Sequence, residues 1–299
     1  MSVANDFKSG YVAIIGPPNV GKSTFLNRVL GQKIAIVSSR PQTTRTRLLG
    51  IHTEPGYQLV FIDTPGIHRP KSTLGQTMVQ TALDSLREAD VVLLILDAKN
   101  PSPENAMQLL LDELRSTSSP AILVLNKVDL VRKDTLLPLI EKYKKLYDFK
   151  AIVPVSALTG ENLDRLLNEI LNYTPQGEPY FPPETITDQQ ERFLAAEMVR
   201  EKVFEFTGQE IPYATAIIID EFKELPEKHL VSISATILVE KTSQKGIMIG
   251  KGGNLLKRIG EAARKDLEIM LDSKVFLRLW VKVRKDWSNS PEIRKEMGF

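Results

Sequence analysis

The sequence contains no cysteine, which excludes a disulfide framework and any thiolate metal site and suits a reducing compartment. Its three histidines, His52, His68 and His229, are far apart in the sequence, so they indicate no metal site. The longest apolar run, residues 91–96, is far too short to span a bilayer. Residues 1–10 are polar and show no signal-peptide core. We therefore expect a soluble globular protein.

Positive charge is scarce in most of the chain and concentrated near its C-terminus. The 299 residues, enough for two domains, carry a net charge of only +2. Residues 245–285 hold eleven lysines and arginines against four acidic residues, a surplus of seven, which leaves −5 for the rest. This asymmetry predicts a polyanionic partner for the C-terminal part.

The N-terminal part contains the pattern G-x-x-x-x-G-K-[ST] of a phosphate-binding loop, between a strand expected at 11–15 and a helix expected at 24–30. Glycines let backbone N–H groups turn toward a polyphosphate, Lys22 would bridge its β- and γ-phosphates, and the Ser23 hydroxyl would ligate Mg²⁺. A chance glycine-rich turn is the alternative, which the strand and helix disfavour. The predicted phosphate-binding residues are Gly16, Pro17, Pro18, Asn19, Val20, Gly21, Lys22, Ser23 and Thr24.

A second polar turn follows two strands expected at 48–53 and 57–62. Asp63 would end the second strand and hold Mg²⁺ through water, while Gly66 would leave its N–H free to face a γ-phosphate. An isolated D-x-x-G is usually only a turn. Its place one hairpin after the phosphate loop favours the functional interpretation.

The pattern N-K-x-D follows a strand expected at 121–125 and predicts the base. Asp129 would accept hydrogen bonds from N1–H and N2–H₂ of guanine, a donor pair that adenine lacks. The Lys127 stem would lie over the base, and Asn126 would brace the neighbouring loops. The backbone of Ser156 and Ala157, after a strand at 151–155, would donate to guanine O6.

Strands and helices alternate through this half, and the binding loops fall at strand ends. Helices are expected at 76–87, at 102–114 with Ser102 as cap, and at 162–171. The pattern predicts an α/β domain with a mostly parallel sheet and one antiparallel hairpin. We place this domain at 1–172.

The second half begins after a connector with four prolines and a glycine in residues 173–183. We place a linker at 173–187, a smaller α+β domain at 188–285 and a tail without assigned role at 286–299. The expected order is α-β-β-α-α-β, with a helix at 188–206, strands at 213–221 and 230–240, a loop at 246–253, a helix at 254–271 and a strand at 274–283.

The loop between the two helical pieces of this domain has the form G-x-x-G. A lone G-x-x-G is most often a turn, and a basic stretch is most often a solvated face. Here topology, charge surplus and loop coincide, and together they resemble a type II K-homology (KH) domain, whose loop clamps about four unpaired nucleotides. The predicted RNA-binding residues are Ile249, Gly250, Lys251, Gly252, Gly253, Lys257 and Arg258.

The ordered motifs resemble those of Ras-like translation-factor-class GTPases, and nearly the whole chain resembles the bacterial Era family, with only a loose fit at residues 285–299. That resemblance implies GTP hydrolysis, with Lys22, Thr44 and Gly66 as catalytic residues. It assigns Thr44, with Thr43 as the alternative, as the switch threonine that ligates Mg²⁺ with Ser23 and Asp63.

The same resemblance implies partners and a role. The KH domain would bind the 3′ end of 16S ribosomal RNA, and the protein would assist 30S subunit assembly and 16S rRNA maturation. A cytoplasmic monomer is implied, with peripheral association at the inner face of the cell membrane. Two other classes remain: a membrane-linked signalling GTPase whose second domain binds protein, and an ATP-driven RNA remodeller, against which Asp129 argues.

Ile67 occupies the position where Ras-like GTPases carry a water-orienting glutamine. Its side chain neither donates nor accepts a hydrogen bond, so we expect slow intrinsic hydrolysis. Asn19 in the phosphate loop suggests a potassium ion as the source of fixed positive charge, as in similar GTPases with asparagine there. The alternative is that Asn19 only fixes the geometry of the loop.

Overall fold

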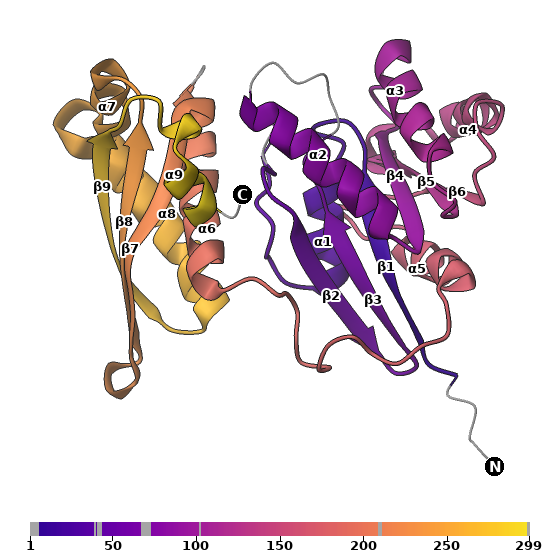
Figure 1. Ribbon diagram of the computed structural model, residues 1–299, viewed down its shortest axis with the longest axis horizontal. Coiled ribbons are helices and arrows are strands. Elements are labelled where there is room, and N and C mark those ends of the chain that lie inside the picture. The colour runs from indigo at the N-terminus through magenta and orange to yellow at the C-terminus, as the bar shows by residue number, and fades with distance from the viewer. Residues whose placement is uncertain are drawn as a thin grey trace. The chain divides into compact units, whose positions relative to one another are not determined.

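The computed structural model describes residues 6–38, 40, 44–66, 73–101, 103–208 and 211–297. The chain divides into two compact units, Met1–Asp188 and Gln189–Phe299 (Figure 1). No helix in the described part of the chain has the length and apolar character needed to cross a membrane. Four residues singled out above, Thr43, Ile67, His68 and Ser102, lie outside the described residues.

The first unit is built on a six-stranded sheet with the order β2-β3-β1-β4-β5-β6. The strands are β1 (Lys8–Ile15), β2 (Leu48–Glu54), β3 (Tyr57–Asp63), β4 (Val91–Asp97), β5 (Ala121–Asn126) and β6 (Ala151–Pro154). Only the β2–β3 pair is antiparallel; the other described pairs are parallel. The predicted α/β architecture with one hairpin is therefore confirmed.

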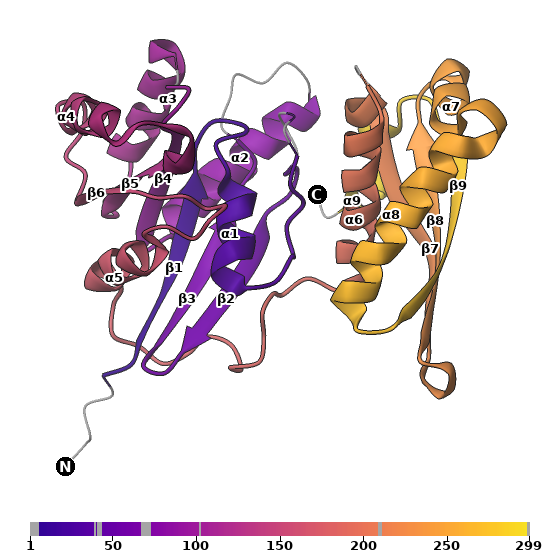
Figure 2. The same cartoon turned by 180° about the vertical axis from the view of Figure 1, so that it is seen from behind.

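Helices cover both faces of this sheet, which is why every residue of β4 and β5 is buried. The helices are α1 (Lys22–Leu30), α2 (Thr73–Glu88), α3 (Glu104–Arg115), α4 (Leu136–Lys144) and α5 (Leu163–Tyr173). Side chains of α2, α3 and α4, such as Leu86, Leu110 and Tyr143, join one apolar cluster with the sheet. Helices α1 and α5 lie on the opposite face, toward the viewer in Figure 2.

The proline-rich segment that follows α5 lies along the first unit. The backbone N–H of Ser9 donates to Pro175 O at 3.1 Å, and that of Ile51 donates to Ile186 O at 2.7 Å. The buried Gln58 side chain donates to Phe181 O at 2.9 Å and accepts from the N–H of Phe181 at 3.0 Å. The segment is thus held by the backbone of β-strands and by the buried amide of Gln58. The exact boundaries of the two domains and the linker stay a prediction.

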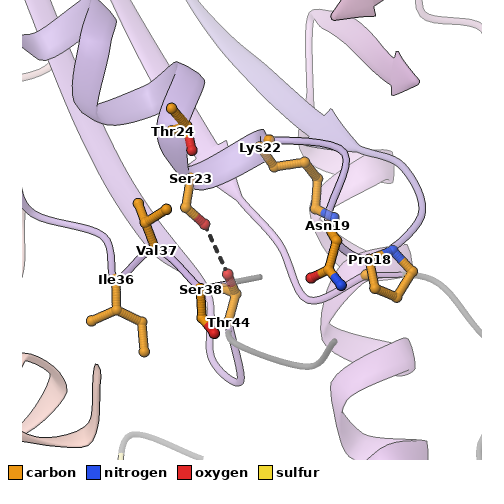
Figure 3. A pocket seen from close by; sticks show the side chains of 11 residues that line it. Pro18, Asn19, Lys22, Ser23, Thr24, Ile36, Val37, Ser38 and Thr44 are labelled. Atoms are coloured by element: carbon orange, nitrogen blue, oxygen red, sulfur yellow. Dashed lines mark hydrogen bonds between the residues drawn. The ribbon is translucent and has the colours of Figure 1, made fainter. Parts of the chain in front are cut away.

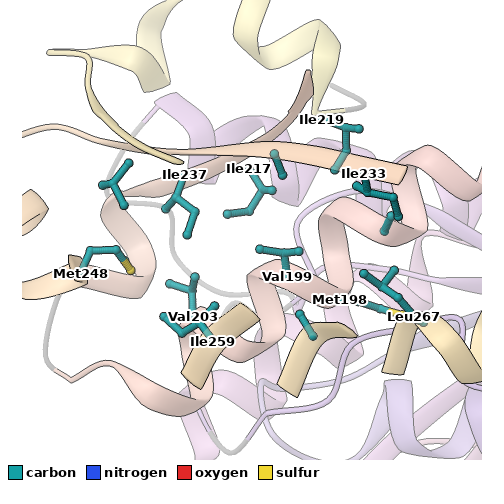
Figure 4. Close-up of a cluster of buried hydrophobic side chains, with 14 of the residues drawn as sticks. Met198, Val199, Val203, Ile217, Ile219, Ile233, Ile237, Met248, Ile259 and Leu267 are labelled. Carbon is teal, nitrogen blue, oxygen red and sulfur yellow. The ribbon is translucent and has the colours of Figure 1, made fainter. Parts of the chain in front are cut away.

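The second unit has a three-stranded sheet with the order β7-β8-β9. The strands are β7 (Thr215–Leu225), β8 (Leu230–Val239) and β9 (Lys274–Val283), with β7 antiparallel and β9 parallel to β8. Helices α6 (Glu191–Phe206), α7 (Thr242–Ile249) and α8 (Asn254–Leu271) pack on one face. Figure 4 shows their core, where Val199, Ile237 and Leu267 meet. The predicted order α-β-β-α-α-β is confirmed.

The tail, for which no role was predicted, packs on the other face of this sheet. The Trp287 side chain is buried, and its Nε1–H donates to Ala214 O at 3.0 Å. Trp287 and Ile293 form an apolar cluster with Ala216 and Leu238, and Ile293 belongs to α9 (Pro291–Glu296). The tail is therefore part of the second unit's fold.

Candidate functional site

The loop between β1 and α1 has a backbone that requires glycine. Gly16 and Gly21 have φ angles of 150° and 98°, and Asn19 has 63°. A Cβ on Gly16 would collide with the carbonyl oxygen of Ile95, and one on Gly21 with the amide nitrogen of Asn126. Helix α1 begins at Lys22 with no side-chain cap, so its electropositive N-terminus faces this loop. The loop therefore offers backbone N–H groups to an anion.

Lys22 adds positive charge beneath the loop. Its side chain is buried, and its Nζ donates to the carbonyl oxygens of Gly16 at 3.1 Å and Pro17 at 2.9 Å. Burial lowers the pKa of Lys22 to about 8, although the nearby Asp63 carboxylate opposes the shift. An anion bound in the loop would replace those carbonyls as the partner of the ammonium group.

Three oxygen-bearing side chains meet beside Lys22. Ser23 Oγ donates to Asp63 Oδ2 at 2.8 Å and lies 3.1 Å from Thr44 Oγ1 (Figure 3). The other carboxylate oxygen, Asp63 Oδ1, is buried and has no hydrogen-bond partner among the described residues. Burial raises the pKa of Asp63, whereas Lys22 and the two hydroxyls lower it. Two hydroxyls and a buried carboxylate with a free oxygen suit a small hard cation such as Mg²⁺.

Lys22, Ser23 and Thr44 line one pocket, shown in Figure 3. Its lining is Pro18, Asn19, Gly21, Lys22, Ser23, Thr24, Ile36, Val37, Ser38, Thr44 and Gly66. The sequence analysis missed residues 36–38, which carry no motif of their own. Gly66 lies against Pro18, where an added Cβ would be 3.2 Å from the proline nitrogen. The structure thus brings Gly66 to the phosphate loop, as its predicted role requires.

Asn126 joins the phosphate loop to the loop after β6. Its Nδ2 donates to Val20 O at 2.8 Å, and its Oδ1 accepts from the N–H of Ala157 at 2.9 Å. The N–H of Ser156 donates to Glu161 O at 3.1 Å. Both N–H groups assigned to guanine O6 therefore have protein acceptors, and O6 would have to share or replace one of them.

Asp97, which the sequence analysis missed, holds Lys127 in place. Lys127 Nζ lies 2.8 Å from Asp97 Oδ2 and donates to Asn19 O at 2.7 Å. Burial raises the pKa of Asp97, but hydrogen bonds from Lys127 and from the N–H groups of Asn100 and Lys99 outweigh it and hold this pKa below its usual value. The available signal was an aspartate at the end of β4, beside Asn126 in the sheet register. Asp129 lies exposed in the 3₁₀ turn Val128–Leu130 that follows.

In the second unit, the G-x-x-G loop separates α7 from α8. Gly250, Gly252 and Gly253 all have positive φ angles, of 74°, 62° and 79°. An added Cβ on Gly250 would lie 2.8 Å from Leu255 Cβ, whereas at Gly252 and Gly253 it would meet nothing within 4 Å. Lys251 is exposed. The outer part of the loop is thus open to the close approach of a ligand.

A groove of about 380 Å³ extends from this loop between α8 and β9. Its lining is Gly253, Leu256, Lys257, Gly260, Glu261, Arg264, Leu277 and Leu279. Lys257 lies in it, as its predicted role requires, with its Nζ 3.9 Å from Glu261 Oε1. Arg258 does not line the groove; its guanidinium lies 4.8 Å from the centre of the Phe206 ring. The leucines of the lining suit bases, and Lys257 and Arg264 suit phosphates, with Glu261 as the one acidic lining residue.

Comparison with known proteins agrees with both sites. Residues 11–127 match the family model described as "50S ribosome-binding GTPase", and residues 210–288 match that of the KH domain. The GTPase Era of Geobacter metallireducens is 54% identical over 295 residues, covering 99% of each chain. That of Ruminiclostridium cellulolyticum is 49% identical over 293 residues, covering 98% of each.

Two solved structures match both units. They are an Aquifex aeolicus Era variant bound to GDP·AlF₄⁻ and Era in complex with MgGDPNP and nucleotides 1506–1542 of 16S ribosomal RNA. Each is 44% identical, with a TM-score of 0.93 over 98% of this chain and 99% of the other. The chain therefore belongs to the Era family and is a GTPase that carries a KH domain.

Proposed function

We propose that this GTPase is a switch whose KH domain binds the 3′ region of 16S ribosomal RNA and assists assembly of the small ribosomal subunit. The observation that carries the proposal is the match of both units, over 98% of the chain, to an Era structure that holds MgGDPNP and a 16S fragment. The groove beside the G-x-x-G loop supports the RNA part, because Lys257 and Arg264 line it beside apolar side chains, with Glu261 as its one acidic lining residue.

In the first unit, each residue of the phosphate site receives a role from its position. Lys22 pairs with the β- and γ-phosphates, and the N–H of Gly66 faces the γ-phosphate. Ser23, Thr44 and Asp63 hold Mg²⁺, with the free Asp63 Oδ1 as the orphaned acceptor that fits it. When bound, this ion neutralises negative charge on the phosphates.

Guanine is selected at the other end of the site. Asp129 accepts from N1–H and N2–H₂, and the stem of Lys127 lies along the base because Asp97 and Asn19 O fix its ammonium group. Excess ATP should therefore fail to displace bound GDP, whereas GTP should displace it at matched concentration. Displacement by ATP would favour the ATP-driven class of protein instead.

The RNA part is tested by salt. Affinity for the fragment 1506–1542 of 16S rRNA should fall linearly on a log–log plot against salt concentration, because phosphate contacts release counterions. The measurement is made with GDP and with a non-hydrolysable GTP analogue, and a switch requires different affinities in the two states. Absence of specific binding in both states would favour a second domain that recognises protein.

Asn19 carries a separate proposal about cations. It lines the phosphate pocket with a strained φ of 63°, and its carbonyl accepts from Lys127 Nζ. We assign its side chain to a potassium ion that offsets charge developing between the β- and γ-phosphates. Hydrolysis should be faster in potassium than in sodium at equal ionic strength, and Asn19→Ala should remove the difference. Equal rates in the two salts would contradict the potassium proposal and would mean that Asn19 only fixes the geometry of the phosphate loop.

Two further assignments belong to the proposal. We place the protein in the cytoplasm as a monomer, with peripheral contact at the inner face of the cell membrane. Co-sedimentation with vesicles that contain anionic lipid tests the membrane contact, and light scattering tests the monomer.

A further inference from the structure

Strand β9 presents two faces with different chemistry. Val275, Leu277, Leu279 and Val281 point to the helix side, where they join or pack against the core of the second unit. The alternate side chains are exposed, and we call them the β9 stripe: Lys274, Phe276, Arg278, Trp280 and Lys282. Successive side chains of a strand point to opposite faces, so the β9 stripe lies on the sheet face opposite α8.

The two rings of the β9 stripe are unusually accessible for their size. Phe276 is 51% exposed and Trp280 is 57% exposed. Their partners in the register of β8 are Ser232 and Thr236, whose short side chains cannot cover a ring. The guanidinium of Arg278 lies 5.3 Å from the centre of the Phe276 ring, so a planar cation stands between the two aromatic side chains. The stripe is therefore a flat row in which rings and cations alternate.

Charge on this face is separated by strand. The β9 stripe contains three basic residues and no acidic one. The acids of the same sheet lie two strands away on β7, where Asp220 accepts from Thr236 at 2.7 Å and Glu221 Oε2 lies 3.5 Å from Ser234 Oγ. Neighbouring strands are about 4.8 Å apart, so β7 lies roughly 10 Å from β9. The stripe is therefore basic from Lys274 to Trp280, whereas Lys282 at its end lines a cavity together with Asp220 and with Glu292 and Glu296 of the tail.

We infer that the β9 stripe is a second RNA-binding surface, on which bases stack against Phe276 and Trp280 while the basic side chains pair with phosphates. Aromatic side chains interleaved with cations form the stacking platforms of proteins that bind single-stranded nucleic acid. The two rings are four residues apart, or roughly 13 Å along the strand, which leaves room for Arg278 to contact a phosphate or base between them. This inference rests on the proposed RNA-binding function.

The position of β9 connects this surface to the proposed groove. Leu277 and Leu279 line the groove, while the β9 stripe lies on the other face of the same strand. β9 is also an edge strand, with only β8 beside it among the described strands. A single strand of RNA that leaves the groove would only have to pass around the free edge of β9 to reach the stripe. A membrane is the less suitable occupant, because Arg278 interrupts the apolar surface between the two rings.

The central experiment compares full-length variants for binding to the fragment 1506–1542 of 16S rRNA. The double variant Phe276→Ala/Trp280→Ala, which lacks both rings, should weaken binding roughly 10- to 100-fold because base–aromatic stacking is lost. Trp280→Phe should retain most of the affinity, since it keeps a ring. Ile269→Ala is the matched control, because Ile269 is 81% exposed on α8 and lies outside the stripe and the groove lining. Circular dichroism and thermal unfolding check that each variant folds.

Two further measurements separate the outcomes. RNA should quench the fluorescence of the exposed Trp280, and this change should vanish in Trp280→Phe, where only the buried Trp287 remains. Gly252→Asp tests the groove independently. If it abolishes binding while Phe276→Ala/Trp280→Ala binds normally, the stripe inference is wrong and the proposed function stands. If neither variant loses affinity, both the stripe and the groove are wrongly assigned, and only the absence of specific binding by the unmodified protein would remove the RNA function itself. Loss of binding to anionic vesicles with unchanged RNA binding would assign the stripe to a membrane and overturn the inference.

Discussion

Two loops in this protein contain glycines at positive φ angles, and glycine is needed there for different physical reasons. In the phosphate loop, Gly16 and Gly21 face neighbouring atoms that leave no room for a Cβ. In the G-x-x-G loop, Gly252 and Gly253 have positive φ angles but open space around them. The first pair is required by packing, whereas the second is required by backbone conformation and by access for the ligand.

The two loops also differ in how firmly neighbouring side chains hold them. The phosphate loop is held by the buried Asn126, which bonds Val20 O, and by the half-buried Lys127, which bonds Asn19 O. In the G-x-x-G loop Lys251 is exposed, and a Cβ added to Gly252 or Gly253 would meet nothing within 4 Å. We conclude that the nucleotide site is preorganised by the fold, while the proposed RNA site depends on charge and accessible backbone.

The largest effect should come from filling the space beside the phosphate loop. Gly16→Ala sets a Cβ against the carbonyl of Ile95, and the displacement should cost about 3 kcal/mol and weaken GDP binding roughly 100-fold or more. Gly252→Ala is the matched control, since its Cβ meets nothing and only the positive φ costs about 1–2 kcal/mol. Thermal unfolding and calorimetry measure both, and equal losses would show that packing does not distinguish the loops.

The second effect adds charge to the open loop. Gly252→Asp places a carboxylate where a phosphate must approach, and like-charge repulsion should weaken RNA binding by about 2–3 kcal/mol, roughly 30- to 150-fold. GTP hydrolysis without RNA should not change. Gly252→Ala separates backbone strain from charge, so an alanine variant that loses as much affinity would contradict the electrostatic explanation. The assay is filter binding to the fragment 1506–1542.

The third effect concerns the base. Asp129→Asn removes a charged acceptor for guanine N1–H and N2–H₂, so GTP should bind more weakly by roughly 1.5–3 kcal/mol. Xanthine nucleotide, which exchanges a donor for an acceptor on that edge, should gain affinity. Competition binding with GTP and xanthosine triphosphate measures both changes. Unchanged GTP affinity would remove Asp129 from the site.

The smallest effect is a pH dependence of phosphate binding at Lys22 in the phosphate loop. Because the pKa of Lys22 is about 8, its ammonium form dominates below pH 8 and is lost as the pH rises above it. The charged form pairs with phosphate, so affinity should fall about tenfold between pH 7 and pH 9. Lys22→Arg, whose guanidinium stays charged over this range, is measured alongside as the control for titration of the ligand itself. A flat profile over this range would place the pKa of Lys22 near that of an ordinary lysine.

Much of the fold was readable from the sequence because its signals are local. Alternating buried strands, the phosphate-loop glycines and helix stops such as Gly31, with φ of 67°, fix most elements near their observed bounds. Helix α4 was missed because Pro138 interrupts its first turn and Tyr143 is its only fully buried described residue. Local patterns also gave no reason to place Trp287 in a core.

The site was predictable where a motif spans neighbouring residues, and less so where the fold brings distant ones together. Lys22 and Ser23 follow from one spacing pattern. Asp97 has no such pattern; its role depends on the register that sets it beside Asn126 and on the ion pair with Lys127. Arg258 lies against the Phe206 ring instead of lining the groove, and this position likewise depends on packing between α6 and α8. Long-range contacts of this kind are set by tertiary structure alone.

One amide gives the nucleotide site a kinetic property. Asn126 bonds the phosphate loop through Val20 O and the loop after β6 through the N–H of Ala157. Opening either loop to release a ligand would break a hydrogen bond to the same side chain. We therefore expect the two loops to open together, so that the lifetime of a bound nucleotide depends on one shared opening event.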